Sequence, residues 1–417
     1  MLFCDVHFLY NILIFFIDLL LPITAIFNPK MKLFVNGRKS TFQTITSKIN
    51  PSDQVIWIHC ASLGEFEQGR PIIKNFKLQF PNYKIVLTFF SPSGYEIRKN
   101  YEYADVVVYL PLDTPQNVHK FINVVHPEIA IFVKYEFWPN YLKQLHKLNI
   151  KTILISGIFR ENQAFFKPNF TWFRNQLRAF SHFFVQDVTS VSLLNKIGFQ
   201  NVSLSGDTRF DRVFQLINSK KELPYLKTFA LHSQVLVAGS TWPPDEALLT
   251  SYINQSSNSS EKFIIAPHNI KPVEIEKLKS SLQKKVVLYS QMDDQSAQNA
   301  QVIIIDSIGL LSSVYELGQI AYVGGGFGTG IHNILEPATY GIPVLIGPKY
   351  QKFKEAVDLV KLGGCIEIKN ESELFQTLHS LTQNQTLTSS KGQICKHYVL
   401  DNIGASKKIL DYIQDVL

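Results

Sequence analysis

The chain has 417 residues, of which 46% are hydrophobic and 18% are charged, and its formal net charge is +7. This length suffices for two domains of ordinary size, and the composition excludes an intrinsically disordered chain. The basic balance suits an anionic partner, for which a membrane surface, a phosphorylated lipid and nucleic acid all qualify. The cysteines show neither C-x-x-C nor Cys/His spacing, which predicts a reducing compartment and neither a disulfide framework nor a zinc site. They are Cys4, Cys60, Cys365 and Cys395.

The N-terminal segment is mostly apolar over residues 8–27. Its length is marginal for a spanning helix, and an acid near its centre, Asp18, costs about 2.5–3.5 kcal/mol on insertion scales. No basic segment precedes it, which argues against a cleaved signal peptide. We therefore predict a membrane anchor over residues 1–40, spanning or interfacial, with a basic flank on the cytoplasmic side; a buried first helix is the alternative. The flank contains Lys30, Lys32, Arg38 and Lys39.

From Val55 onward, short β-rich runs alternate with amphipathic segments of helical length. This alternation predicts βαβ units and a parallel sheet. The strands expected in the first half are 55–59, 84–88, 105–109, 129–133, 152–155 and 182–185. The strands expected in the second half are 235–238, 263–266, 286–289, 302–305, 320–323 and 344–347.

The two series of strands predict an α/β protein with two Rossmann-like, doubly wound domains that face a cleft. Residues 211–228 lack clear strand character and contain Pro224, so we place the hinge there. The predicted domains are 41–218 and 219–417, and the last helix, about 404–416, is expected to pack on the first half. Ligands bind such sheets at the carboxyl ends of the strands, which directs attention to the residues after each strand.

A glycine-rich stretch in the second half is the most informative part of the chain. After the strand 320–323, five glycines fall within residues 324–330, and a helix is expected over about 333–340. Each glycine costs about 0.5–1 kcal/mol of backbone entropy, so a turn that only has to close would use fewer. A helix start behind such a turn presents free N–H groups to a phosphate. Alternatively, Asn333 and Glu336 form an ordinary capping box.

Three clusters follow predicted strands in the first half. Glu65 lies in the first turn of a helix behind Gly64, where it is either a base or the capping partner of Ser62. The segment 134–140 brings charged and aromatic side chains to the end of the fourth strand, and the segment 206–211 contains Arg209, a candidate cation for a phosphate or carboxylate. An ordinary surface ion pair is the alternative for each cluster taken alone.

Together these clusters closely resemble the Kdo transferases, which attach 3-deoxy-D-manno-oct-2-ulosonic acid (Kdo) to the lipid A precursor of Gram-negative bacteria. The resemblance covers nearly the whole chain and includes the N-terminal anchor. The shared motifs are NPK and GRK, WIH-x-x-S-x-GE, T-x-x-SPSGYE, YLPLDTP, E-x-WPN, G-D-x-R/K-FD, GG-x-x-x-x-GIHN-x-LEP and GIPVLIGP.

The resemblance implies a GT-B-type, inverting glycosyltransferase that uses CMP-Kdo as donor and needs neither a bound metal nor a cofactor. It implies an acceptor-binding first domain, a donor-binding second domain, no nucleic acid partner, and a location at the cytoplasmic face of the inner membrane. Glu65 would be the general base, and Glu136 and Arg209 would support charge in the transition state. The CMP group would lie against Pro267, His268, Ile308, Gly309, Leu310, Asn333, Ile334, Leu335 and Glu336.

The chain also departs from the family pattern. Lys134, Pro267 and Leu310 stand where members often have an acid, an Arg and an acid, so contacts through the last two must be apolar or through the backbone. Two other functions remain open: an enzyme of the same fold acting on UDP-sugars, and a membrane-tethered binding protein without activity. UDP binding would indicate the first, and dispensability of Glu65 would indicate the second.

Overall fold

A computed structural model describes residues 2–218, 222–328 and 330–417. The chain divides into two compact units, Met1–Arg212 with Ile403–Leu417, and Val213–Asn402. We call them the N-terminal and C-terminal units. The division falls inside the helix α10 (Thr208–Asn218). The boundary expected at 218/219 adjoins residues 219–221, which lie outside the described residues.

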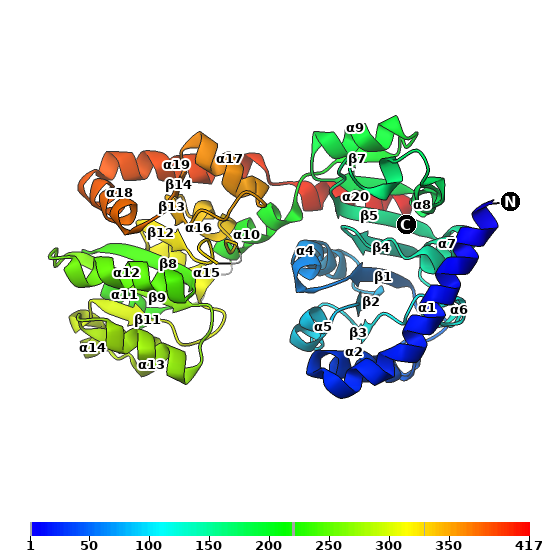
Figure 1. Cartoon of the computed structure of the whole chain (residues 1–417), viewed down its shortest axis with the longest axis horizontal. Helices are drawn as coiled ribbons and strands as arrows, with labels where there is room; N and C mark the ends of the chain where they lie inside the picture. Colours follow the sequence, from blue (N-terminus) through cyan, green and yellow to red (C-terminus); the bar gives the residue numbers. More distant parts are fainter. Residues whose placement is uncertain (1, 219–221, 329) are drawn as a thin grey trace. The chain divides into compact units, whose positions relative to one another are not determined.

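The N-terminal unit is built on a seven-stranded sheet with the order β3-β2-β1-β4-β5-β6-β7, and all of its pairings are parallel (Figure 1). The strands are continuous apolar runs because helices cover both faces of a parallel sheet. Their bounds are β1 (Val55–Cys60), β2 (Lys84–Phe89), β3 (Val106–Tyr109), β4 (Ile129–Val133), β5 (Lys151–Gly157), β6 (His182–Val185) and β7 (Val202–Leu204).

Alternate residues of the central strand β1 enter different cores, as the period of two in a strand requires. Trp57 belongs to the core that includes residues of α6, α7 and α9 on one face, and Ile58 belongs to the core that includes residues of α4 and α20 on the other. The helices of this unit are α1 (Leu2–Phe27), α2 (Pro29–Lys39), α3 (Thr41–Thr46), α4 (Leu63–Gln79), α5 (Pro92–Arg98), α6 (Pro115–Val125), α7 (Pro139–Lys147), α8 (Thr171–Gln176), α9 (Val188–Lys196), α10, α20 (Ala405–Val416) and the 3-10 turns η1 (Ala164–Phe166) and η2 (Leu177–Ala179).

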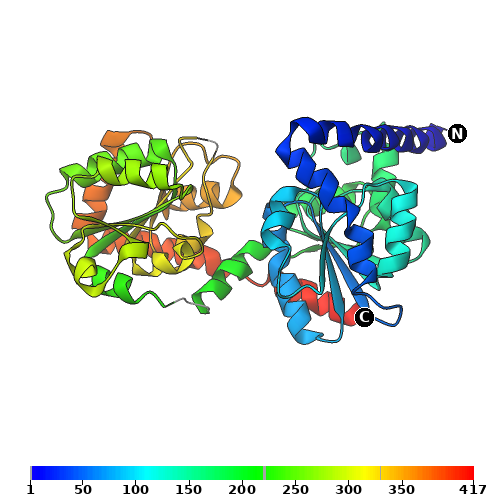
Figure 2. The same cartoon turned by 90° about the horizontal axis from the view of Figure 1, so that it is seen from below.

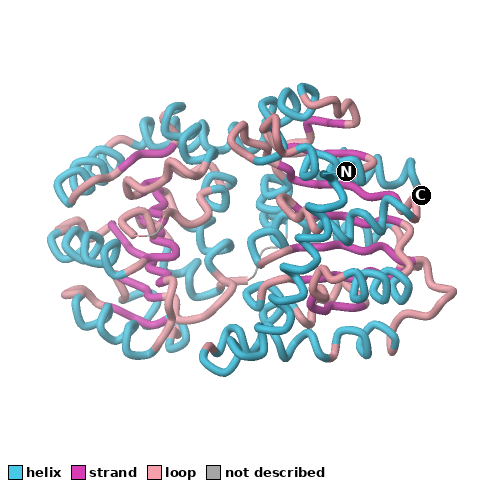
Figure 3. The backbone as a smooth tube through the Cα atoms, turned by 45° about the vertical axis from the view of Figure 1, so that its right-hand side comes forward, coloured by secondary structure: helices cyan, strands magenta, loops and turns pink. Residues whose placement is uncertain are grey.

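The C-terminal unit repeats this plan, with its strands between helices (Figure 3). Its sheet is parallel and has the order β10-β11-β9-β8-β12-β13-β14. The strand β12 has the predicted bounds. The strands are β8 (Gln234–Thr241), β9 (Glu261–Pro267), β10 (Val286–Leu288), β11 (Val302–Ile304), β12 (Ile320–Val323), β13 (Val344–Ile346) and β14 (Cys365–Glu367).

The predicted class of two Rossmann-like parallel sheets is confirmed, although the strands β7 and β14 were missed. The helices of the C-terminal unit are α11 (Pro224–Ala230), α12 (Pro243–Gln255), α13 (Pro272–Ser281), α14 (Asp294–Asn299), α15 (Leu311–Val314), α16 (Leu335–Thr339), α17 (Lys354–Leu362), α18 (Glu371–Gln383), α19 (Gln385–Asp401) and the 3-10 turns η3 (Tyr289–Gln291) and η4 (Tyr315–Leu317).

The helix after the glycine-rich turn is shorter than predicted, because α16 begins two residues after Asn333 and has five residues. The Asn333 side-chain oxygen accepts the N–H of Leu335 at 3.1 Å, so this residue forms the turn that precedes the helix. At the other end Gly341 adopts φ +73°, a left-handed conformation that stops the helix. A helix of this length contributes little dipole to a phosphate site.

The last helix, α20, packs on the N-terminal unit against α4 and β6. The Tyr412 ring lies 4.6 Å from the ring of His182 on β6. Asp211 on α10 accepts the backbone N–H groups of Gly404 (2.5 Å) and Ser406 (2.6 Å), at the start of α20. The expected packing of the last helix on the first half is thus observed.

The helix α1 lies along the N-terminal unit, with most of its apolar side chains exposed (Figures 1 and 2). Its segment Val6–Phe27 is long and apolar enough to cross a membrane, and none of it is buried. The alternative of a buried first helix is therefore wrong. The following helix α2 is attached firmly to the unit, since Phe34 is buried and the Arg38 side chain donates to the backbone oxygens of Leu110 (2.9 Å) and Phe90 (2.8 Å).

Candidate functional site

Glu65 is in the first turn of α4, at the carboxyl end of β1, where the sequence placed it. The Ser62 hydroxyl accepts the Gly64 N–H at 3.2 Å and donates to the Glu65 carboxylate. In a capping box the acid would instead accept the backbone N–H of the capping residue. The other carboxylate oxygen lies 3.9 Å from Lys134 Nζ, at the end of β4. The Glu65 carboxylate thus lies between a hydroxyl donor and an ammonium group, which fix its position at the strand end.

Glu136 is the second acid at this edge of the sheet. Its Oε2 accepts the indole N–H of Trp138 at 2.7 Å and lies 3.1 Å from His59 Nε2. Because a carboxylate only accepts, the His59 proton must be on Nε2. His59 is completely buried, and its Nδ1 lies 2.8 Å from the hydroxyl of Thr88. One imidazole N–H and one indole N–H thus fix the position of the Glu136 carboxylate.

Arg209 is held by the residue two positions before it. Asp207 Oδ2 accepts from Arg209 Nε (2.8 Å) and from a terminal guanidinium nitrogen (2.7 Å), and Oδ1 accepts the Arg209 backbone N–H (2.9 Å). Because the guanidinium is planar, the bonds at Nε and at one terminal nitrogen fix the direction in which its remaining N–H groups point. Arg209 is therefore a cation with a fixed orientation.

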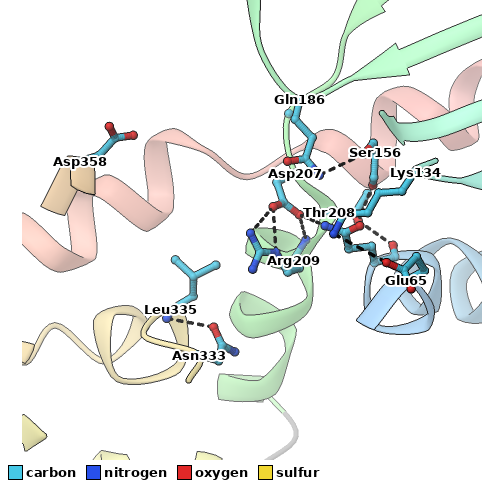
Figure 4. Close-up of polar contacts among 12 residues, drawn as sticks. Glu65, Lys134, Ser156, Gln186, Asp207, Thr208, Arg209, Asn333, Leu335 and Asp358 are labelled. Carbon is cyan, nitrogen blue, oxygen red and sulfur yellow. Dashed lines mark hydrogen bonds and ion pairs between the residues drawn. The ribbon is translucent and has the colours of Figure 1, made fainter. Parts of the chain in front are cut away.

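The start of α10 is joined to the helix that carries Glu65, although their strands are far apart in the sheet. Thr208 Oγ1 donates to the backbone oxygen of Gln68 on α4 at 2.6 Å, and the Ser156 hydroxyl lies 3.1 Å from the same oxygen atom of Thr208 (Figure 4). Since β1 and β4 are neighbours, the loops that carry Glu65 and Glu136 also meet at one edge. The structure thus brings Glu65, Glu136 and Arg209 to the same edge of one sheet.

A cysteine also lies at this edge. Burial raises the pKa of the Cys60 thiol, and the nearby carboxylates of Glu65 and Glu136 raise it further. The thiol therefore stays protonated at neutral pH and is unsuited to act as a nucleophile. Cys60, Cys365 and Cys395 are free and buried; the side chain of Cys4 lies outside the described part of the chain.

In the C-terminal unit, Asp245 fixes the glycine-rich turn. It is buried, and its carboxylate accepts the hydroxyl of Tyr322 (2.8 Å) and the backbone N–H groups of Gly325 (2.8 Å) and Trp242 (2.9 Å). Gly325 has φ +93°, which favours glycine. A Cβ on Gly326 would lie 2.6 Å from the backbone of the loop after β13. These two glycines are required by the backbone geometry of the turn itself.

Three rings form a stack beside this turn. The Trp242 ring centroid lies 4.4 Å from that of His268, which in turn lies 4.6 Å from that of His332. Trp242 Nε1 donates to His332 Nε2 at 2.9 Å, so the proton of a neutral His332 is on Nδ1. Burial lowers the pKa of His332, and the neighbouring His268 lowers it further. The stack therefore presents a planar aromatic surface in which His332 is neutral at neutral pH.

The substitution Trp242→Phe is expected to raise the pKa of His332. It keeps a ring in the stack but removes the N–H that donates to the lone pair of the neutral imidazole, and hydrogen bonding to the neutral form disfavours the charged one. NMR titration of the His332 ring protons measures this pKa. Trp172→Phe, which changes a Trp of the N-terminal unit, is the control. An unchanged His332 pKa in the Trp242→Phe protein would contradict the assigned tautomer.

Asn333 and Glu336 interact directly. Asn333 Nδ2 donates to Glu336 Oε1 at 3.2 Å, and the other carboxylate oxygen accepts the hydroxyl of Ser312 at 2.6 Å. Ser312 is in α15, behind Gly309, which has φ +82°. The loops after β11 and β12 are thus tied together at the carboxyl edge of the sheet, and the side chain of Ile308 is 85% exposed between them.

The sequence thus predicted residues on neighbouring loops, but it missed the side chains that connect them. Pro267 and His268 follow β9, residues 308–310 follow β11, and residues 333–336 follow β12. The missed connecting residues are Trp242, Asp245, Ser312 and His332. Trp242 comes directly after β8, so an inspection of each strand end would have found it.

Among the described residues, no group of three or more His, Cys, Asp or Glu side chains is placed to hold a metal ion. The acidic pair at the start of α14 illustrates why. Asp293 Oδ1 accepts the backbone N–H of Ser296 at 2.7 Å. Hydrogen bonds from the Ser296 side chain and from this N–H lower the pKa of the Asp293 carboxyl. Asp293 therefore acts as a helix cap.

A family model described as "3-Deoxy-D-manno-octulosonic-acid transferase (kdotransferase)" matches residues 36–212. The 3-deoxy-D-manno-octulosonic acid transferase of Aquifex aeolicus is 30% identical over 338 residues, which cover 78% of this chain and 85% of that protein. The chain belongs to the 3-deoxy-D-manno-octulosonic acid transferase family. The Haemophilus influenzae transferase of this name is 27% identical over 395 residues, or 88% of each chain. As a member of this family the chain is a glycosyltransferase, as its motifs predicted.

Solved structures with similar folds show how widely this architecture is shared. A UDP-GlcNAc 2-epimerase from Neisseria meningitidis bound to UDP-GlcNAc has a TM-score of 0.60 and 14% identity, and covers 87% of this chain and all of its own. MurG from Acinetobacter baumannii has a TM-score of 0.53 and 11% identity, with coverage of 87% and 99%. At these identities the similarity concerns the fold alone.

Proposed function

We propose that this chain transfers Kdo from CMP-Kdo to a lipid A precursor, with inversion at the anomeric carbon and without a metal ion, in lipopolysaccharide core biosynthesis. The observation that carries the proposal is the position of Glu65. Its carboxylate is at the carboxyl edge of the sheet, held by Ser62 and Lys134, in a chain of the Kdo transferase family.

Glu65 acts as the general base on the acceptor. Its carboxylate takes the proton of an acceptor hydroxyl, whose oxygen bonds to the anomeric carbon of Kdo. The bond between that carbon and the phosphate oxygen breaks, and CMP leaves with the electron pair. Attack opposite the leaving group inverts the configuration. A positioned base contributes typically 10²–10⁴-fold, because a sugar hydroxyl is a very weak acid.

Glu136 and Arg209 stabilise the charges that develop during this step. The Kdo centre becomes electron-poor as the bond to CMP lengthens, and a fixed carboxylate such as Glu136 stabilises positive charge. The leaving phosphate gains negative charge, which the guanidinium of Arg209 stabilises. Both side chains are held by bonds within the N-terminal unit, so little reorganisation is needed when the charges form.

The C-terminal unit binds the CMP group of the donor. His268 and the residues 308–310 and 333–336 line its strand ends, with backbone or apolar contacts from Pro267 and Leu310. Glu336 suits hydroxyl groups, since both of its carboxylate oxygens already accept from neutral donors, Asn333 and Ser312. The N–H groups of Gly324, Gly325, Gly328 and Gly330 are bonded within the protein, so the turn supports the loop that faces the donor, and a cationic side chain meets its single phosphate.

A basic, apolar N-terminus suits a lipid acceptor at the cytoplasmic face of the inner membrane. The exposed apolar side chains of α1 are followed by Lys30, Lys32 and Lys39, which are also exposed. Each Lys or Arg near an anionic membrane surface adds about 1 kcal/mol to binding. This arrangement would hold the transferase beside a phosphorylated lipid.

Incubation of the purified protein with CMP-Kdo and detergent-dispersed lipid A precursor is expected to give a Kdo-containing product, identified by mass spectrometry. Excess EDTA is expected to leave the rate unchanged, because the single leaving phosphate can be neutralised by a cationic side chain such as Arg209. The same assay with UDP-GlcNAc is the control for a UDP-sugar enzyme. Loss of activity in EDTA with recovery in magnesium would overturn the metal-free mechanism, and turnover of UDP-GlcNAc alone would overturn the proposed donor.

A further inference from the structure

Over residues 6–27, the helix α1 has two chemically different faces. The positions His7, Tyr10, Asn11, Ile14 and Leu21 are partly buried, and their spacing of three, four and seven residues places them on one face. The opposite face is exposed and apolar. It consists of Phe8, Leu9, Ile12, Leu13, Phe15, Phe16, Ile17, Leu19, Leu20, Ile23, Ile26 and Phe27.

The polar face of α1 is bound to the N-terminal unit by specific contacts. The Tyr10 hydroxyl donates to Asp113 Oδ2 at 2.7 Å, and Asn11 Oδ1 accepts from the Asn140 side chain at 2.7 Å. The Tyr10 ring also lies 5.9 Å from the ring of Trp172. Asp113 is 1% exposed, so removal of α1 would uncover a buried carboxylate.

The one acid in the apolar segment is on this same face. Asp18 lies seven and eight residues after Asn11 and Tyr10, and it lines a cavity of about 270 Å³ together with Arg38, Lys39 and Asn117. Two cationic side chains and an amide thus surround the space next to the Asp18 carboxylate. His7, Tyr10 and Asn11 therefore face the protein, and Asp18, whose side chain is exposed, borders the cavity beside α2.

The C-terminal end of α1 is also held. Asn28 caps α2, its side-chain oxygen accepting the N–H of Lys30 at 2.9 Å, and α1 packs against α2. The Arg38 guanidinium lies 3.5 Å from the centre of the Phe34 ring and donates to two loops of the unit. Both ends of α1 are thus attached to the same unit.

We propose that α1 lies flat in one leaflet of a lipid bilayer, parallel to its surface, and does not cross it. The apolar face enters the lipid while the polar face stays on the N-terminal unit, and the exposed lysines of α2 meet anionic headgroups. A spanning orientation would break the Tyr10 and Asn11 bonds and expose the Asp18 carboxylate to hydrocarbon, where no partner satisfies it. The proposal rests on the proposed function only in taking a membrane as the partner.

Depth measurements by electron paramagnetic resonance distinguish the two orientations. Spin labels are attached to the variants Phe8→Cys, Leu19→Cys and Phe27→Cys in the full-length protein with Cys4→Ser, bound to vesicles of phosphatidylethanolamine and phosphatidylglycerol. The remaining cysteines are buried. Val273→Cys, at a side chain that is 81% exposed on the C-terminal unit, is the matched control in water.

We expect similar depths for the three labels, about 5–10 Å below the headgroups. A helix that crosses the bilayer would instead place the label at 19 about 16 Å deeper than the label at 8, since each residue rises 1.5 Å along the axis. That gradient would overturn the proposal, and so would labels that stay as accessible to water as the control.

Protease protection in cells gives an independent measurement. Tags at the N-terminus and the C-terminus are expected on the same side of the membrane, both protected in intact spheroplasts and both cleaved after lysis. Cleavage of the N-terminal tag alone in intact spheroplasts would show a spanning helix. Product formation is measured separately in detergent, so a wrong orientation and a wrong activity give different results.

Discussion

Glu65→Gln is expected to lower turnover at least about 100-fold, the lower limit for the loss of a positioned base. Glutamine keeps the shape of the side chain and can still bind the Ser62 hydroxyl, but it cannot take a proton from the acceptor. A residue that only caps α4 would cost about 1 kcal/mol of stability and little rate. Turnover of CMP-Kdo, the melting temperature and CMP affinity together separate these two roles.

Glu102→Gln is the matched control, because it makes the same change of charge at an exposed position of the same unit. We expect this control to keep wild-type turnover, and we expect both proteins to bind CMP with unchanged affinity. Retention of more than about a tenth of wild-type turnover by Glu65→Gln, well short of the range for base catalysis, would assign Glu65 to a structural role.

Arg209→Gln is expected to lower turnover about 10²–10³-fold, the usual effect of removing one group that stabilises developing negative charge. Arg209→Lys keeps the charge but loses the forked contact with Asp207, so we expect it to recover most of this rate. Steady-state kinetics with CMP-Kdo checks both variants. The expected loss is in kcat, since the charge forms only as CMP leaves.

Arg209→Gln also leaves the Asp207 carboxylate, which is 7% exposed, without its cation. An unpaired buried charge lowers stability, so the stability of this variant has to be measured as well. The melting temperature therefore accompanies the kinetics, and Arg178→Gln, at an exposed position of the same unit, is the control for loss of a positive charge. Equal activity of the Arg209→Gln and Arg209→Lys proteins, both folded, would show that the charge of residue 209 takes no part in the transition state.

The sheets were predictable because their strands are buried on both faces and read as continuous apolar runs. The strand β12 was predicted with its observed bounds, and β4 and β6 were as well. The strands β7 and β14 were missed because each has only three residues, and most of these are partly exposed. Their composition therefore differs little from that of a loop. Neighbouring strands, and not local sequence, stabilise such short edges.

The sequence allowed candidate site residues to be proposed, but not the side chains that hold them. Glu65 was proposed from its place after a strand and a glycine, whereas Lys134 reaches it from the end of another strand of the sheet. Asp245 was missed because its structural role depends on hydrogen bonds from Tyr322 and Gly325, about 80 positions away in the sequence. Such contacts depend on the order of strands in the sheet, which the hydrophobic pattern leaves open.

The attachment of α20 to the first unit makes that unit discontinuous in the sequence. Residues 213–402 are in effect a domain inserted into another, so the ribosome completes the C-terminal unit before it releases the helix that finishes the N-terminal one. Until then the apolar surface on α4 and β6, including Phe184, lacks the cover that Tyr412 and Ile413 provide. During synthesis this surface remains open to aggregation or to a chaperone, and the last 15 residues of the chain end that exposure.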